Sequence, residues 1–212
     1  MVGGVPAAPE HHATVRHRAA VLAGYQGDPM SAREALRDPH PRVRAAALGA
    51  LARCDQLDTA TIRTALADVD PGVRRRAITL AIDRPEIDLV TWLSDPDNTV
   101  IEQVAWACGE RPAGAAAVDA LTHLVFEHTE PLVREAAVAA LGSLGDDRGL
   151  DAILHACTDR APVRRRAVLA LAPFDTPAVR EMLRTARNDR DWQVRQSAED
   201  LATIMAIDED DH

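Results

Sequence analysis

The sequence predicts an all-α solenoid of about six antiparallel helix pairs preceded by an N-terminal capping helix. The main observation is a Val, usually followed by Arg, that opens an Ala-rich apolar run at a nearly constant interval. The repeated residues are Val15, Val43, Val73, Val100, Val133, Val163 and Val194. Successive residues of this set are 28, 30, 27, 33, 30 and 31 positions apart. A period of this size is typical of a repeat array in which each unit packs on its neighbours.

Two further observations indicate helices rather than strands. Counted from each Val, apolar residues recur four, seven and eight positions later, on one face of a helix. In the second unit these residues are Val43, Ala47, Ala50 and Leu51. The runs also follow turn residues that favour a helix start, as in Asp38-Pro39-His40-Pro41. Asp can cap the helix there, and Pro suits its first turn.

The elements follow in order along the chain. Residues 1–12 are rich in Gly, Pro and His and are expected to be disordered. The repeats are expected over residues 13–206, with an acidic tail at 207–212. The first Val-Arg helix, near residues 14–25, has no partner before it and is expected to cap the array. Each later Val-Arg helix is expected to follow a partner helix. These partners are predicted at Pro29–Arg37, Thr59–Ala67, Pro85–Ser94, Ala116–His128, Arg148–Thr158 and Pro177–Arg187.

Composition narrows the classes of function. Aromatic residues make up 3% of the chain, so the core is expected to rely on many close helix contacts rather than on large side chains. The net charge of −9 disfavours nonspecific binding to nucleic acid or to an anionic membrane. All 24 basic residues are Arg, which excludes Schiff-base catalysis and a P-loop lysine.

Cysteine usage and the N-terminus predict a cytoplasmic protein. Cys54, Cys108 and Cys157 are odd in number and widely spaced, which indicates reduced, packed thiols rather than a disulfide framework. The first residues lack the basic start and apolar run of a signal peptide. No apolar run is long enough to span a bilayer.

The sequence offers no convincing catalytic or metal-binding group. His123 and Glu127 lie four apart on one predicted helix, with His128 beside them, but no further ligand joins them. Neither a metal nor another cofactor is expected. A catalytic Gly-rich phosphate loop or nucleophile elbow is also missing from the sequence.

A motif in the turn of the pairs gives the chain a family resemblance. An Asp lies in this turn and an Arg follows six positions later, as in Asp38 with Arg44, Asp68 with Arg74 and Asp189 with Arg195. In this the chain resembles HEAT repeats, in particular the short bacterial HEAT-like type that includes phycobilisome lyases. The resemblance covers about residues 13–206 and implies a ladder of Asp–Arg pairs between neighbouring repeats. The residues assigned to this ladder are Asp38, Arg44, Asp68, Arg74, Arg134, Arg164, Asp189 and Arg195.

Three repeats depart from the motif. The fifth has His128 in the place of Asp but keeps Arg134, and the sixth has Asp159 one position closer to Arg164. The fourth keeps Asp95 but has Ile101 where Arg is expected. Its spacing is also irregular, so we expect residues 95–115 to be the weak point of the array.

Candidate binding residues lie on the exposed ridge of the second helices, which is the concave face in the arrays that the chain resembles. They are Arg75, Arg76, Glu102, Gln103, Trp106, Arg165 and Arg166. Trp106 has two interpretations: an exposed anchor for a partner, or a filler between helices where the repeat is irregular. The charges could likewise form a mixed groove for a partner, or neutralise one another across units.

The resemblance favours a non-catalytic, protein-binding scaffold, because such solenoids mostly bind proteins. We expect a monomer that binds a protein or peptide segment. The Arg clusters at residues 74–76 and 164–166 suit an acidic partner. Neither a membrane nor a nucleic acid is expected as a partner. Fold analogy suggests two alternative functions, an alkylpurine DNA glycosylase and a chromophore lyase subunit. The net charge of the chain argues against the glycosylase. HEAT-like iron hydroxylases carry adjacent His-Glu pairs, and this chain has no His-Glu dipeptide.

Overall fold

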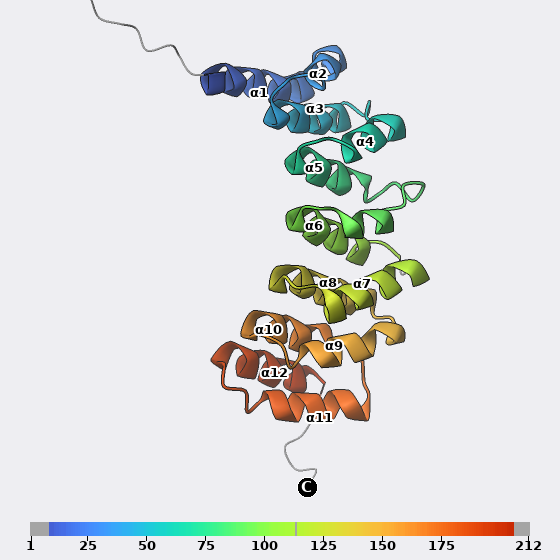
Figure 1. Ribbon diagram of the computed structural model, residues 1–212, viewed down its shortest axis with the longest axis vertical. Coiled ribbons are helices and arrows are strands. Elements are labelled where there is room, and N and C mark those ends of the chain that lie inside the picture. Colours follow the sequence, from blue (N-terminus) through green and yellow to red (C-terminus); the bar gives the residue numbers. More distant parts are fainter. Residues whose placement is uncertain (1–8, 113, 206–212) are drawn as a thin grey trace, which may run out of the picture. The chain divides into compact units, whose positions relative to one another are not determined.

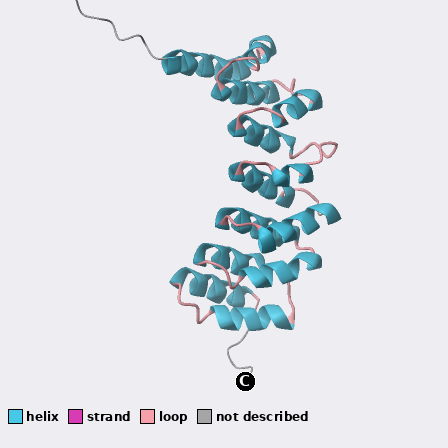
Figure 2. Ribbon diagram, viewed as in Figure 1, coloured by secondary structure: helices cyan, strands magenta, loops and turns pink. Residues whose placement is uncertain are grey.

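The protein is an all-α solenoid built from helix pairs (Figures 1 and 2). The computed structural model describes residues 9–112 and 114–205, and every regular element in these ranges is a helix. The chain divides into two compact units, Met1–Ile87 and Asp88–His212. The predicted fold class is therefore confirmed, and each unit is described by itself below.

Unit 1 contains a long first helix and two helix pairs. Its helices are α1 (Pro9–Gln26), α2 (Pro29–Ala35), α3 (Pro41–Arg53), α4 (Thr59–Leu66) and α5 (Pro71–Ala81). Helix α3 packs on its partner α2 and on both α1 and α5, while α4 packs on α5. The Val-Arg helices therefore stack directly on one another, and each partner helix covers one side of the stack.

Unit 2 contains four pairs arranged on the same plan. Its elements are η1 (Val90–Ser94), α6 (Asn98–Gly109), α7 (Ala115–Glu127), α8 (Pro131–Leu144), η2 (Asp147–Gly149), α9 (Leu150–Ala156), α10 (Ala161–Ala170), α11 (Pro177–Ala186) and α12 (Trp192–Ile204). Helices α6, α8, α10 and α12 pack successively, and η1, α7, α9 and α11 are their partners.

Two predicted boundaries are corrected. Helix α1 begins at Pro9, so residues 9–12 form its first turn instead of a disordered segment, as suits Pro at a first helical position. The predicted helix over Pro85–Ser94 is only the 3-10 helix η1, because the Asp88 carboxylate accepts the Val90 backbone N–H at 3.0 Å and holds a local turn. Residues 1–8 and the acidic tail at 207–212 lie outside the described residues.

The N-cap of α3 lies two residues later than the sequence suggested. Because α3 begins at Pro41, its N-cap is His40, whose ring nitrogen accepts the Arg42 N–H. Asp38 instead holds the preceding turn by accepting the His40 N–H at 2.8 Å. Pro occupies the first turn of α3, as the pattern predicts.

Close helix contacts between small residues build the core, as the composition predicts. A Cβ added to Gly24 of α1 would lie 2.7 Å from the Cα of Ala50 in α3. The same addition at Gly142 of α8 would lie 2.7 Å from the Cα of Ala170 in α10. These distances are shorter than any real contact of a Cβ, so glycine at these positions sets how closely stacked helices approach.

Candidate functional site

Arg44 shows how a ladder Arg side chain bridges two repeats. Arg44 donates through Nη1 to the backbone carbonyls of Asp38 and Pro39, at 3.0 and 3.1 Å. Its Nη2 and Nε donate to the two carboxylate oxygens of Asp68 in the next repeat, at 2.6 and 2.8 Å. The Arg therefore pairs with the Asp of the following repeat, while the Asp six residues before it contributes only a carbonyl oxygen. This bidentate geometry is the stronger form of the interaction.

The same arrangement recurs in both units. The pairs and their N–O distances are Arg16–Asp38 at 2.6 Å and Arg44–Asp68 at 2.6 Å in unit 1, and Arg134–Asp159 at 2.6 Å and Arg164–Asp189 at 2.7 Å in unit 2. Arg74 and Arg195 donate to the carbonyls of Asp68 and Asp189. The one-residue shift of Asp159 does not prevent its pairing. These Arg residues therefore hold the array together rather than forming a basic stripe for phosphate.

The ladder lowers the pKa of its carboxylates. The Arg134 guanidinium holds the pKa of Asp159 below its ordinary value, and Arg164 does the same to the pKa of Asp189. Arg16 likewise lowers the pKa of Asp38. In each case a hydrogen bond to the charged carboxylate outweighs the opposing effect of burial.

One pair of the ladder has lost both of its members. By the register of the other pairs, Ile101 of α6 occupies the Arg position whose partner would be residue 128. Ile101 is buried as an ordinary core residue, and residue 128 is His, whose Nδ1 accepts the Glu130 N–H at 3.1 Å. His128 therefore keeps the turn that Asp holds elsewhere without carrying a carboxylate. Loss of both partners leaves no charge stranded in the interface.

A groove lies beside this altered position in unit 2. It has a volume of about 330 Å³ and is formed by α6 and α8, with one side chain from α10. Its lining residues are Glu102, Trp106, Gly109, Glu110, Leu132, Glu135, Ala136, Ala139, Ala140, Ser143 and Arg166.

Two large apolar side chains are exposed in the lining of this groove. Trp106 is 44% exposed and Leu132 is 61% exposed. Ala136, Ala139 and Ala140 of α8 leave the space beside the indole open because they end at Cβ. The indole of Trp106 is therefore accessible, which favours the anchor interpretation over the gap-filling one.

The charged residues of the groove include an ion pair. Arg166 Nε lies 3.7 Å from the Glu135 carboxylate. Glu102 and Glu110 add two further acidic side chains to the lining. The groove thus combines an aromatic anchor with a net acidic polar lining.

The structure brings three of the seven predicted residues into this groove: Glu102, Trp106 and Arg166. Gln103 is half-buried and does not line the groove. Arg165 donates to Gln193 Oε1 at 3.1 Å instead. Arg75 and Arg76 belong to unit 1, where Arg75 is exposed and Arg76 lines a different groove.

Sequence analysis missed several members of the lining, above all Leu132. It directly precedes the Val of its repeat and follows Pro131, so it resembles a turn residue. The sequence did carry a signal that Leu132 is exposed for binding, because a helix cap rarely needs a large apolar side chain at this position. Glu110 and Ser143, ten positions after their Val, could have been found only by extending the exposed ridge one turn further.

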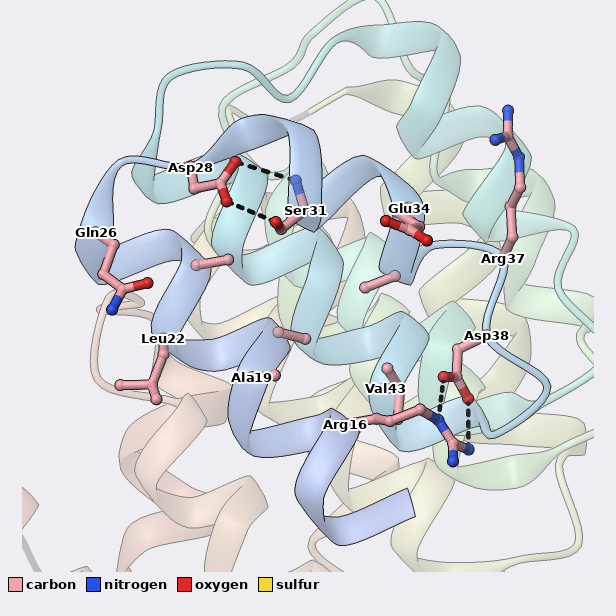
Figure 3. A pocket seen from close by; sticks show the side chains of 13 residues that line it. Arg16, Ala19, Leu22, Gln26, Asp28, Ser31, Glu34, Arg37, Asp38 and Val43 are labelled. Carbon is pink, nitrogen blue, oxygen red and sulfur yellow. Dashed lines mark hydrogen bonds and ion pairs between the residues drawn. The ribbon is translucent and has the colours of Figure 1, made fainter. Parts of the chain in front are cut away.

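The largest hollow of unit 1 lies between α1 and α2 and has a volume of about 780 Å³ (Figure 3). Two of its acidic residues are already engaged. Arg16 reaches across to Asp38, and Asp28 caps α2 by accepting from Met30 N and Ser31 N. The polar groups drawn together here thus stabilise the start of the array.

The described residues offer neither a metal-binding cluster nor a reactive thiol at Cys108 or Cys157. Among described residues, no group of three or more His, Cys, Asp or Glu side chains could hold a metal ion. Burial raises the pKa of Cys108 to about 11 and that of Cys157 to about 12. These thiols stay protonated near neutral pH and are poor nucleophiles. No helix of the described part is long and apolar enough to cross a bilayer.

Comparison with known proteins agrees with this architecture. Residues 87–172 match the family model described as HEAT repeats. These residues, which are less than half of the chain, are thus similar to HEAT repeats. No curated protein matches the chain.

Two solved structures are similar in fold. Human deoxyhypusine hydroxylase, in a complex with glycerol, is 20% identical, and the match covers 92% of this chain and 81% of that one with a TM-score of 0.48. An engineered protein is 20% identical, with 90% and 84% of the chains covered and a TM-score of 0.44. Similarity at this level concerns the fold alone.

Proposed function

We propose that this HEAT-repeat protein is a non-catalytic scaffold that binds a protein segment through the groove of unit 2. The observation that carries the proposal is the exposed indole of Trp106, which lines the same groove as exposed Leu132 and three alanines of α8. Trp is among the residue types most enriched at the energetic centres of protein interfaces. A cytoplasmic location is part of the proposal, because the three cysteines are free thiols.

The groove suits one apolar side chain of a partner, held between Trp106 and Leu132. Its volume of about 330 Å³ exceeds that of a single large side chain. Three of the four charged side chains that line the groove are carboxylates, Glu102, Glu110 and Glu135. Their net negative charge would favour basic residues beside the apolar anchor, because opposite charges across an interface speed encounter and fix register. The same carboxylates oppose a DNA backbone, so the structure adds an argument against the glycosylase alternative.

Capture of a partner with matched variants tests this proposal. Wild-type protein, Trp106→Ala, Leu132→Ala and the control Leu169→Ala would be used as bait in extracts of the source cells. Leu169 is 45% exposed in α10 of the same unit but does not line the groove. We expect a partner retained by wild type and Leu169→Ala and lost with Trp106→Ala. Equal retention by all four baits would overturn the assignment.

A further inference from the structure

Unit 1 contains a second groove, between α1, α3 and α5, with the opposite charge. Its volume is about 320 Å³. The lining residues are His17, Val21, Arg42, Ala45, Ala46, Gly49, Arg53 and Arg76. Three of these eight carry a permanent positive charge and none is acidic, although the whole chain has a net charge of −9.

Arg76 is the central cation of this groove. Its guanidinium lies against α3 at Gly49, where an added Cβ would be 2.5 Å from Nη2, so glycine makes room for it. The side chain is half-buried, and within the described residues its guanidinium has no hydrogen-bond or ion-pair partner. Burial lowers the pKa of Arg76, and the charge of Arg53 lowers that pKa further. Arg76 is therefore a partly desolvated cation without a counter-charge.

Arg53 and His17, which also line the groove, are held by local contacts. The Arg53 guanidinium lies 4.7 Å from the ring centroid of Tyr25, a cation–π contact. The Nδ1 of His17 donates to the backbone carbonyl of Arg42 at 3.1 Å. These two contacts hold Arg53 and His17 in place in the groove that Arg76 also lines.

The repeat register supplies an internal comparison for Arg76. Arg166 occupies the same position in unit 2, three residues after its Val, and it pairs with Glu135 of the preceding repeat. The position equivalent to Glu135 in unit 1 is Ala45. The Arg is thus present in both grooves, but the acid that neutralises it is missing from unit 1.

We propose that the unit 1 groove binds a carboxylate side chain of an acidic protein segment, with Arg76 as its central partner and Arg42 and Arg53 at its sides. A carboxylate would take the place that Glu135 fills beside Arg166 in unit 2. Charge-assisted, bidentate bonds from guanidinium groups are the strongest side-chain hydrogen bonds available for such a ligand. A small cationic groove on an acidic protein suits such a segment better than a nucleic acid, which needs a continuous positive track. This inference rests on the proposed protein-binding role but not on the groove of unit 2.

Binding of a fluorescent oligoglutamate peptide to the purified full chain tests the inference. An oligoglutamine peptide is the uncharged control. We expect Arg76→Gln to weaken oligoglutamate binding about tenfold or more, because a charge-assisted bond is lost. The matched variant Arg166→Gln, in the same register of unit 2, should change it by less than about twofold because Glu135 already occupies that Arg.

Ala45→Glu is the decisive variant, because it keeps Arg76 and supplies the missing acid. It should abolish oligoglutamate binding while raising the thermal midpoint of unfolding, which separates site blockage from loss of fold. Equal weakening by Arg76→Gln and Arg166→Gln would overturn the inference, and so would equal affinity for the two peptides. Tighter Arg76-dependent binding of duplex DNA than of oligoglutamate would assign the groove to nucleic acid instead. Trp106→Ala should leave oligoglutamate binding unchanged, so failure of this inference and failure of the unit 2 groove are distinguishable.

Discussion

Replacing Arg164 with Met tests the structural role of the ladder most sharply. The Arg164 side chain is 7% exposed, and that of its partner Asp189 is 15% exposed. Nη2 and Nε donate to the Asp189 carboxylate at 2.7 and 2.8 Å, and Nη1 donates to the Asp159 carbonyl at 2.7 Å. Met fills a similar volume but leaves the Asp189 carboxylate without its cation and the Asp159 carbonyl without its donor.

The expected cost follows from this burial. Removing one member of a buried ion pair costs about 3–5 kcal/mol, mainly because the remaining charge is stranded. Since Asp189 keeps some contact with water and still accepts the Asp191 N–H at 2.8 Å, we expect a loss of about 3 kcal/mol in the free energy of unfolding. The double variant Arg164→Met with Asp189→His should recover most of this loss, because it copies the natural pair Ile101 and His128, in which the His ring nitrogen still accepts the backbone N–H of the turn.

Urea unfolding followed by circular dichroism measures the effect. The control is Arg180→Met, which removes an exposed pair with Asp175 in the same unit, where the two side chains are 38% and 65% exposed. This control should cost less than about 1 kcal/mol. If Arg164→Met is no more destabilising than Arg180→Met, or if the double variant is less stable than the single one, the reasoning is wrong.

Four further predictions concern pH, thiols, glycines and local opening. The fold lowers the pKa values of Asp38, Asp159 and Asp189. The stability that these carboxylates contribute should therefore be complete above their unfolded pKa of about 4 and lost as pH falls through the lower folded values. Unfolding midpoints measured across this pH range check the prediction, and constant midpoints would contradict it. Cys108 and Cys157 should react slowly with iodoacetamide at pH 8 in the native state and rapidly in urea, whereas fast native labelling of either thiol would refute their packing. Gly142→Ala should destabilise the protein by about 1–3 kcal/mol because its Cβ would meet Ala170, and an unchanged urea midpoint would contradict this. Hydrogen exchange should show earlier opening of residues 95–115 than of the flanking repeats, and uniform protection would remove the expectation of a weak fourth repeat.

The periodicity of the sequence was sufficient to predict the fold. The Val residues that open the helix pairs and the residues four, seven and eight positions later give most of the buried face of each second helix. Val15 of α1 departs from this pattern, because it is 57% exposed. The segment before η1 could not be predicted in this way, because the side chain of Asp88 competes for the backbone N–H of Val90 and local capping outweighs the helical pattern.

The partner of each ladder Arg depended on information that a linear motif does not contain. Asp38 lies six residues before Arg44, and Asp68 lies 24 residues after it. The spacing of six recurs at Asp68 with Arg74 and at Asp189 with Arg195, whereas the spacing from an Arg to its later Asp varies between 22 and 25 residues. Only the stacking of α3 on α5 decides that the carboxylate of Asp68 is the partner. Stacking of the Val-Arg helices also explains why Arg76 and Arg166 differ, although they are equivalent as sequence positions. Arg166 pairs with Glu135 of the preceding repeat, whereas the equivalent residue beside Arg76 is Ala45.

The candidate site was predictable in part. Trp106 and Glu102 follow from the exposed ridge of the repeat, and they line one groove in the structure. Leu132 could not be separated from ordinary turn residues by position alone. Its 61% exposure beside Trp106 is a tertiary property that depends on the close packing of α6 on α8.

The most direct test of the central claim, that the groove of unit 2 binds a protein segment, is site-specific photo-crosslinking in the source cells. A photo-reactive amino acid would replace Ser143, an exposed residue of the groove lining, and in a control chain Glu199, an exposed residue of α12 outside it. We predict a covalent adduct with one defined protein from position 143, which disappears when Trp106→Ala is added. No adduct from position 143, or an identical adduct from position 199, would contradict the claim.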